Sequence, residues 1–164
     1  MILGKRLSAV ASEVDGKSMA DVGCDHGKVS MACLLSGKVE KVIACDISSK
    51  SLQKAIDLAE KLNVKNIEFR VGNGLQVISD GEVDCVVIAG MGGIEIMNIL
   101  SHIPNGVKIL VLSPHRNTIE LRDFLQRNLF CSAVFAVWRL GRREQAERCA
   151  YFMGRALRFV CGDV

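Results

Sequence analysis

Met19 to Gly27 read MADVGCDHG, a short apolar run that ends in a carboxylate and two glycines. A strand with only a structural role would end in an ordinary turn, whereas this one leaves room for a ligand to lie against the backbone. In parallel α/β sheets, ligands bind beyond the carboxyl ends of the strands. This stretch therefore predicts the first strand of such a sheet and the edge of a binding site.

Four further apolar runs share this character. All are short, rich in Val and Ile, and bounded mostly by Gly, Asp or Asn, which is typical of strands buried on both faces of a parallel sheet. The five runs cover residues 18–23, 41–47, 66–71, 83–89 and 107–112. Helical patterns follow three of them, over 49–62, 94–103 and 118–129. The alternation predicts a doubly wound, Rossmann-like α/β fold with helices on both faces of the sheet.

The two ends of the chain complete the predicted domain. We expect an N-terminal helix within residues 1–15, laid against the core. Two more strand-like runs, at 131–138 and 150–160, are expected to pair antiparallel, with the polar segment between them forming a loop or a short helix. The prediction is one domain over residues 1–164, built on a mostly parallel seven-stranded sheet, in which residues 130–164 form atypical C-terminal strands.

Composition excludes several classes of protein. No stretch reaches the 18 or so uninterrupted apolar residues of a membrane span, and the N-terminus lacks the basic leader of a signal peptide, so we expect a cytoplasmic protein. The seven cysteines include no CxxC pair, which favours free thiols over a disulfide framework. No His, Cys or Asp cluster has the spacing of metal ligands, and no metal is predicted.

The charge of the chain permits a nucleic-acid partner without requiring one. The formal net charge is +3. Nine of the eleven arginines lie at or after Arg116. Chance explains this distribution, and so does an arginine-rich surface suited to phosphates. The sequence predicts no oligomeric state.

The charge of the first loop distinguishes between cofactors. A dinucleotide site has G-x-G-x-x-G, whose free amides face a pyrophosphate. Here Asp21 precedes the turn and Asp25 stands where a second glycine is expected. Carboxylates attract a cation and repel a pyrophosphate. The D-x-G-x-x-x-G pattern therefore favours S-adenosylmethionine, which carries a sulfonium, an ammonium and no phosphate.

Polar residues also end the second and third predicted strands. Asp46 can accept both ribose hydroxyl protons, with Ile47 packed on the adenine ring, or it can cap the next helix. Asn73 can bond the adenine edge, with Gly74 allowing close approach, or the two residues can form a plain Asn-Gly turn. Three suitable residues at three successive strand ends favour a nucleoside-bearing cofactor.

The loop after the fourth predicted strand reads Ala89-Gly-Met-Gly-Gly93. Three glycines in four residues allow a planar base to lie close to the backbone, with exposed amides available as donors. Met91 either lines this slot or fills the core. The Asp/Asn-Pro-Pro-aromatic loop that holds the target amine in many amino-group methyltransferases is absent.

Several of these segments resemble a bacterial family that methylates N1 of adenine 22 in the tRNA D-arm, a family of class I S-adenosylmethionine-dependent methyltransferases. The matching segments are DVGCDHG, RVGNGL, IAGMGG, LSPHRNTIELRDFL and the Lys5-Arg6-Leu7 run. The likeness covers about residues 3–129. The family typically has Gln-Pro after the fifth strand, where this chain has Ser113-Pro114-His115, and continues into a C-terminal helical extension, which this chain is expected to lack.

The resemblance implies an S-adenosylmethionine-dependent tRNA (adenine-N1)-methyltransferase with tRNA as its partner. The implied cofactor-binding residues are Asp21, Gly23, Cys24, Gly27, Asp46, Ile47, Asn73, Gly74, Ala89, Gly90 and Met91. The implied substrate-binding residues are Gly92 and Gly93, together with Lys5, Arg6, Arg116 and Arg122, which either contact RNA phosphates or form solvated surface. Asp25 is the candidate for stabilising the cationic product; His26 either orients the base, accepts a proton, or caps the following helix.

Two other functions stay open at this point. One is an NAD(P)-dependent oxidoreductase, disfavoured because G-x-G-x-x-G is absent and Asp25 would face the pyrophosphate. The other is a methyltransferase-fold protein that binds a cofactor or RNA without catalysis.

Overall fold

The computed structural model describes residues 3–128, 137–139, 150–152 and 155–161. Five parallel strands form the body of the sheet, in the order β3-β2-β1-β4-β5. They are β1 (Ser18–Val22), β2 (Lys41–Asp46), β3 (Ile67–Val71), β4 (Cys85–Ala89) and β5 (Ile109–Ser113). The strand order reverses between β1 and β4, the place where ligands bind in open α/β sheets. The predicted fold class is confirmed.

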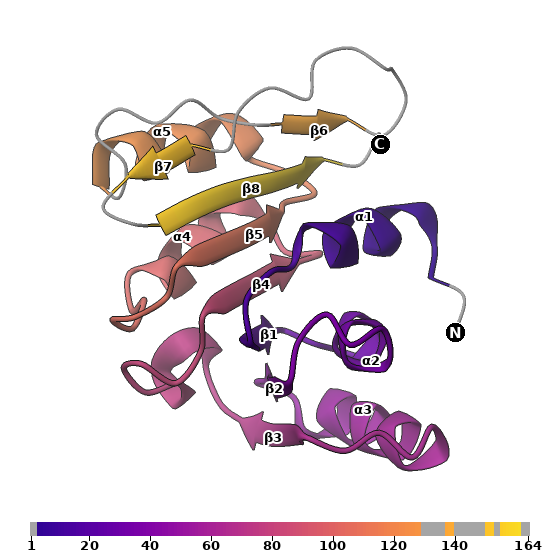
Figure 1. The fold of residues 1–164 in the computed structure, drawn as a ribbon. Helices are drawn as coiled ribbons and strands as arrows, with labels where there is room; N and C mark the ends of the chain where they lie inside the picture. Colours follow the sequence, from indigo (N-terminus) through magenta and orange to yellow (C-terminus); the bar gives the residue numbers. More distant parts are fainter. Residues whose placement is uncertain (1–2, 129–136, 140–149, 153–154, 162–164) are drawn as a thin grey trace.

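Helices cover both faces of this sheet (Figure 1). On one side lie α1 (Lys5–Glu13), α2 (Lys28–Leu35) and α3 (Ser49–Lys61). On the other lie α4 (Gly93–Leu100), α5 (Thr118–Asn128) and the 3-10 turn η1 (Gly74–Val77). Alternate residues of a strand point to opposite faces of the sheet and so belong to two hydrophobic cores. Met19 packs in the core beneath α1–α3, while its neighbour Ala20 packs in the core beneath α4 and α5.

The prediction of seven strands is wrong, because the described residues contain eight. Beyond the five central strands lie β6 (Val137–Arg139), β7 (Ala150–Phe152) and β8 (Arg155–Cys161). The run at 150–160, predicted as one strand, forms two antiparallel strands, β7 and β8. The expected antiparallel pairing of the two C-terminal runs is also wrong, since β6 and β8 run parallel and β8 extends the sheet beside β5.

Parts of the C-terminal prediction lie outside the described residues, namely most of the 131–138 run and the segment 140–149. Within the described part, no helix is long and apolar enough to cross a membrane. The four cysteines whose burial the structure describes, Cys24, Cys33, Cys45 and Cys85, are buried, and none of these four is joined in a disulfide.

Asp84 joins the beginnings of three strands at the edge of the sheet opposite the strand carboxyl ends. Its carboxylate accepts hydrogen bonds from the Lys17 amide at 3.1 Å, the Ser18 amide at 3.3 Å and the Lys108 ammonium at 2.7 Å. Its own backbone amide donates to the Ser18 carbonyl at 3.1 Å. The Lys108 ammonium and these amide donors lower the pKa of Asp84.

We expect Asp84→Ala to lower the free energy of unfolding by about 1–3 kcal/mol, because the amide donors at the start of β1 and the Lys108 ammonium lose their shared acceptor. Urea denaturation measures the change. Asp123→Ala, which removes an exposed carboxylate from α5, is the matched control and should change stability by less than about 0.5 kcal/mol. Equal effects of the two substitutions would contradict the role given to Asp84.

Candidate functional site

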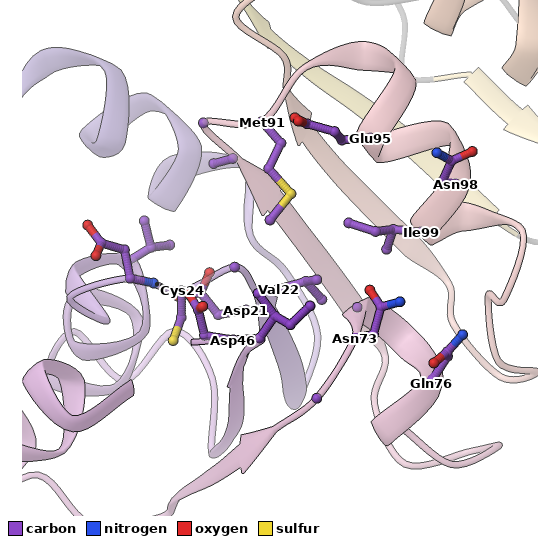
Figure 2. A pocket seen from close by; sticks show the side chains of 18 of the residues that line it. Asp21, Val22, Cys24, Asp46, Asn73, Gln76, Met91, Glu95, Asn98 and Ile99 are labelled. Atoms are coloured by element: carbon purple, nitrogen blue, oxygen red, sulfur yellow. Dashed lines mark hydrogen bonds between the residues drawn. The ribbon is translucent and has the colours of Figure 1, made fainter. Parts of the chain in front are cut away.

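A pocket of about 1070 Å³ opens at the carboxyl ends of the central strands. Its walls come from the loop after β1, the ends of β2 and β3, the loop after β4, and helices α1 and α4. Figure 2 shows Asp21, Cys24 and Asp46 on one side of it, with Asn73 and Gln76 across the opening and the Met91 side chain reaching in from the loop after β4. The pocket thus spans the point where the strand order reverses.

Most of the predicted site residues line this one pocket. Of the predicted cofactor-binding residues, it is lined by Asp21, Gly23, Cys24, Asp46, Ile47, Asn73, Gly74, Ala89, Gly90 and Met91. Both predicted catalytic residues, Asp25 and His26, line it as well. Of the predicted substrate-binding residues, Arg6 lines it, while Lys5, Gly92, Gly93, Arg116 and Arg122 do not.

Packing accounts for two of the predicted glycines that lie outside the pocket, Gly93 and Gly27. A Cβ on Gly93 would lie 2.2 Å from the Asn117 carbonyl oxygen, so this glycine lets α4 begin against the loop that precedes α5. Gly27 precedes α2 with a φ of 62°, and a Cβ there would lie 2.9 Å from the Cβ of Ala55 on α3. Both positions are fixed by helix packing.

Asp21 is a carboxylate held under the floor of the pocket. Only 5% of the residue is exposed, and the Ser30 hydroxyl from α2 donates a hydrogen bond of 2.6 Å to its Oδ2. Burial raises the pKa of Asp21 to about 6, and the bond from Ser30 opposes that rise. The carboxyl group therefore pays a desolvation cost when it ionises, which a cation in the pocket would offset.

Asp46 ties the loop after β1 to the end of β2. One carboxylate oxygen accepts from the Asp25 amide at 3.1 Å, and the other from the Ser48 amide at 2.8 Å. Helix α3 is capped by a different side chain, since Ser48 Oγ accepts from the Ser51 amide at 3.3 Å. Asp46 therefore shapes the binding loop and remains half-buried at the pocket wall.

The loop itself has a compact, fixed course. The Cys45 carbonyl accepts from the amides of Gly23 at 2.9 Å and Cys24 at 3.1 Å, and the Gly27 amide donates to the Cys24 carbonyl at 2.7 Å. Asp25 has a φ of 47°, in the left-handed region that Asp and Asn tolerate better than most residues. Its side chain lies 3.6 Å from His26 Nε2, with both side chains largely exposed.

Met91 covers Gly23 from the opposite side of the pocket. Gly23 has a φ of 68°, and a Cβ there would fall 1.9 Å from the Met91 methyl carbon. Glycine at this position thus gives the thioether its space. Ile47, by contrast, is 72% exposed, an apolar side chain presented at the pocket rim.

Sequence reasoning missed one whole wall of the pocket. Its α4 side is lined by Glu95, Asn98 and Ile99, which are spaced i, i+3 and i+4 and so share one helix face, and by His102 in the turn that follows the helix. That spacing was a readable signal. The other lining residues that were missed are Leu7, Val22, Lys28, Val29, Gly72, Gln76 and Ser101.

Within the residues that the structure describes, no three His, Cys, Asp or Glu side chains come together as a metal site. The pocket's charged groups are instead four carboxylates, one guanidinium and one ammonium, from Asp21, Asp25, Asp46, Glu95, Arg6 and Lys28. Negative charge dominates near the strand ends. Such a site suits a ligand with a positive centre and does not suit a pyrophosphate.

Comparison with known proteins agrees with this description. A family model described as "Methyltransferase domain" matches residues 3–133. Among curated proteins, the chain is 35% identical over 133 residues to the tRNA (adenine(22)-N(1))-methyltransferase of Bacillus subtilis (strain 168), a match that covers 78% of this chain. The chain spans 56% of the length of that relative.

Two solved structures are similar over the same region. A protein of the NADB-Rossmann superfamily from Streptococcus agalactiae has a TM-score of 0.74 and 32% identity, covering 78% of this chain and 60% of that one. The M. capricolum TrmK structure, in complex with S-adenosyl-homocysteine, has a TM-score of 0.70 and 26% identity, covering 76% of this chain and 57% of that one.

The raised pKa of Asp21 makes a prediction about stability. Since the folded-state pKa of about 6 exceeds the ordinary 3.8, ionisation of Asp21 disfavours folding, a cost absent below about pH 3.8 and complete above about pH 6. We expect Asp21→Asn to raise the free energy of unfolding at about pH 7 by on the order of 1–3 kcal/mol, and the gain to shrink as the pH falls through 6 toward 4. Denaturation of both proteins across this range measures the difference. A variant that is less stable at every pH would contradict it.

Proposed function

The chain belongs to the methyltransferase-domain family, and from this premise we propose that it transfers the methyl group of S-adenosylmethionine to N1 of adenine 22 in tRNA. The observation that carries the proposal is the meeting of Asp21, Asp46 and Asn73 in one pocket at the strand ends. The B. subtilis relative, named for this reaction, supports the choice of substrate. The chain spans only 56% of that relative, so the assignment of the relative's reaction to this chain is itself part of the proposal.

The pocket residues fit S-adenosylmethionine. The buried Asp21 carboxylate favours a cation above it, and three carboxylates near the strand ends disfavour a phosphate-bearing nucleotide. In the proposed arrangement, Asp46 accepts hydrogen bonds from the ribose hydroxyls, Asn73 bonds the adenine edge, and the exposed Ile47 packs against the ring. The remaining predicted cofactor residues, Gly23, Cys24, Gly74, Ala89, Gly90 and Met91, would line the space around it.

S-adenosylmethionine supplies a methyl group that its sulfonium already activates. The protein's task is therefore alignment and exclusion of water more than acid–base chemistry. Adenine N1 is used in Watson–Crick pairing, so the pocket must receive an unpaired or extruded base. The pocket-lining part of the loop after β4, Ala89 to Met91, offers backbone along which a planar base can lie, and the exposed Gly90 is the proposed contact. Gly92 and Gly93, predicted as substrate-binding residues, are buried outside the pocket.

The methylated adenine carries a positive charge, and Asp25 is the residue we propose to stabilise it. Asp25 lines the pocket with an exposed side chain, and its backbone amide donates a hydrogen bond to the Asp46 carboxylate. His26, beside it, is proposed to orient the base. For the RNA backbone we propose Lys5, Arg116 and Arg122, which lie outside the cofactor pocket, as contacts for phosphates.

The substrate is tested by methyl transfer. We expect calorimetry to detect binding of S-adenosylhomocysteine but not of NAD, and radiolabelled methyl to pass to an unmodified tRNA with adenine at position 22. The same tRNA with guanine at that position should accept none. Binding without transfer to any RNA would contradict the catalytic proposal, and binding of NAD alone would favour an oxidoreductase.

The role of Asp25 is tested by Asp25→Asn. Asparagine also tolerates positive φ, and the substitution keeps the backbone amide that donates a hydrogen bond to Asp46. We expect kcat to fall about tenfold to a hundredfold, because the charge opposite the product is lost, while the Kd for S-adenosylhomocysteine changes less than about threefold. Asp57→Asn, on the exposed face of α3, is the matched control. A fall in affinity as large as the fall in kcat would show a role in cofactor binding instead.

A further inference from the structure

We propose that Arg6 binds the carboxylate of the cofactor's amino-acid part, in place of the RNA-phosphate contact predicted from the sequence. The inference rests on the proposed function for the identity of the cofactor. It concerns a part of that molecule for which the strand-end carboxylates provide no partner. An amino-acid carboxylate entering a pocket lined by Asp21, Asp25, Asp46 and Glu95 needs a cation to offset their repulsion.

Two cations line the pocket, and they differ in burial. Arg6 is half-buried in the pocket wall, whereas Lys28, in the first turn of α2, is exposed. Among the residues that the structure describes, the Arg6 side chain forms neither a hydrogen bond nor an ion pair. A half-buried guanidinium with no anionic partner is costly, and a bound carboxylate, which fits its two parallel N–H donors, would remove that cost.

The position of Arg6 matches the amino-acid end of the ligand. A Cβ on Gly90 would lie 3.7 Å from both terminal nitrogens of Arg6, so the guanidinium lies beside the loop that leaves β4. In the sheet order β3-β2-β1-β4, the nucleoside-binding candidates Asp46 and Asn73 stand at the ends of β2 and β3. Arg6 is therefore at the opposite end of the pocket from the residue proposed for adenine, with Asp21 on β1 between them.

Helix α1 holds Arg6 in place. Val10 on this helix is fully buried in the core beneath α2, with Leu7 packed against the same core. At the other end of the helix, the Lys38 ammonium donates hydrogen bonds to the carbonyls of Ala11, at 2.9 Å, and Ser12. The backbone that carries Arg6 is thus fixed against the core, so that only the Arg6 side chain has to be ordered when a ligand binds. Lys5, its neighbour in sequence, is exposed and lies outside the pocket.

The test compares two ligands that differ in the amino-acid part. S-adenosylhomocysteine carries the carboxylate, and 5′-methylthioadenosine has the same nucleoside and a thioether without it. We expect Arg6→Ala to raise the Kd for S-adenosylhomocysteine, measured by calorimetry, about tenfold or more. The Kd for 5′-methylthioadenosine should rise less than about twofold. Unchanged binding of the second ligand shows at once that the variant is folded and its nucleoside site intact. Arg6→Lys should recover part of the loss, and Arg127→Ala, on the exposed face of α5, should have no effect.

The other outcomes overturn the proposal in distinguishable ways. Equal weakening of both ligands would make Arg6 a structural or nucleoside-binding residue, and no weakening of either, with lost tRNA binding, would restore the phosphate role. A selective loss in Lys28→Ala instead of Arg6→Ala would move the carboxylate site to α2. Each of these leaves the proposed methyltransferase function standing. Failure of the unsubstituted protein to bind S-adenosylhomocysteine would overturn both.

Discussion

The Cys45 carbonyl oxygen accepts two amide protons from the loop that leaves β1, and the carboxylate of the next residue, Asp46, accepts a third from Asp25. These bonds join two neighbouring strand ends into one rigid corner. The proposed cofactor site depends on these bonds, because they fix the backbone of Gly23 and Asp25 against the end of β2 and leave the Asp25 side chain exposed. The backbone there can take this course because Gly23 and Asp25 adopt positive φ.

The part of the site that can be predicted from the sequence is the part that follows strand ends. Asp21, Asp46 and Asn73 each come directly at or after an apolar run, and parallel strands bring their carboxyl ends to one edge of the sheet. Backbone topology alone then places residues far apart in the chain in one pocket. The same reasoning predicted the five central strands, whose boundaries are marked by Gly, Asp or Asn.

What could not be predicted depends on packing between elements. Ile94 and Ile96 are equally apolar, yet Ile94 is 52% exposed and Ile96 fully buried, since only the contact with the sheet decides which face of α4 turns inward. Arg6 is similar: its sequence neighbours indicate a basic helix surface, and only the docking of α1 against α2 places one of its two basic residues in the pocket wall. At the C-terminal end, local propensity suggested one strand where the chain forms two, β7 and β8.

The contact between Gly23 and Met91 makes one surface of the pocket out of bare backbone and a single thioether. A methionine side chain has three freely rotating bonds and no branch, so it can change rotamer at little cost. The rotamer of Met91 therefore sets how much space is available above β1. A branched residue in its place would fix the dimensions of the chamber, and a larger residue at Gly23 would take the room the thioether needs to move.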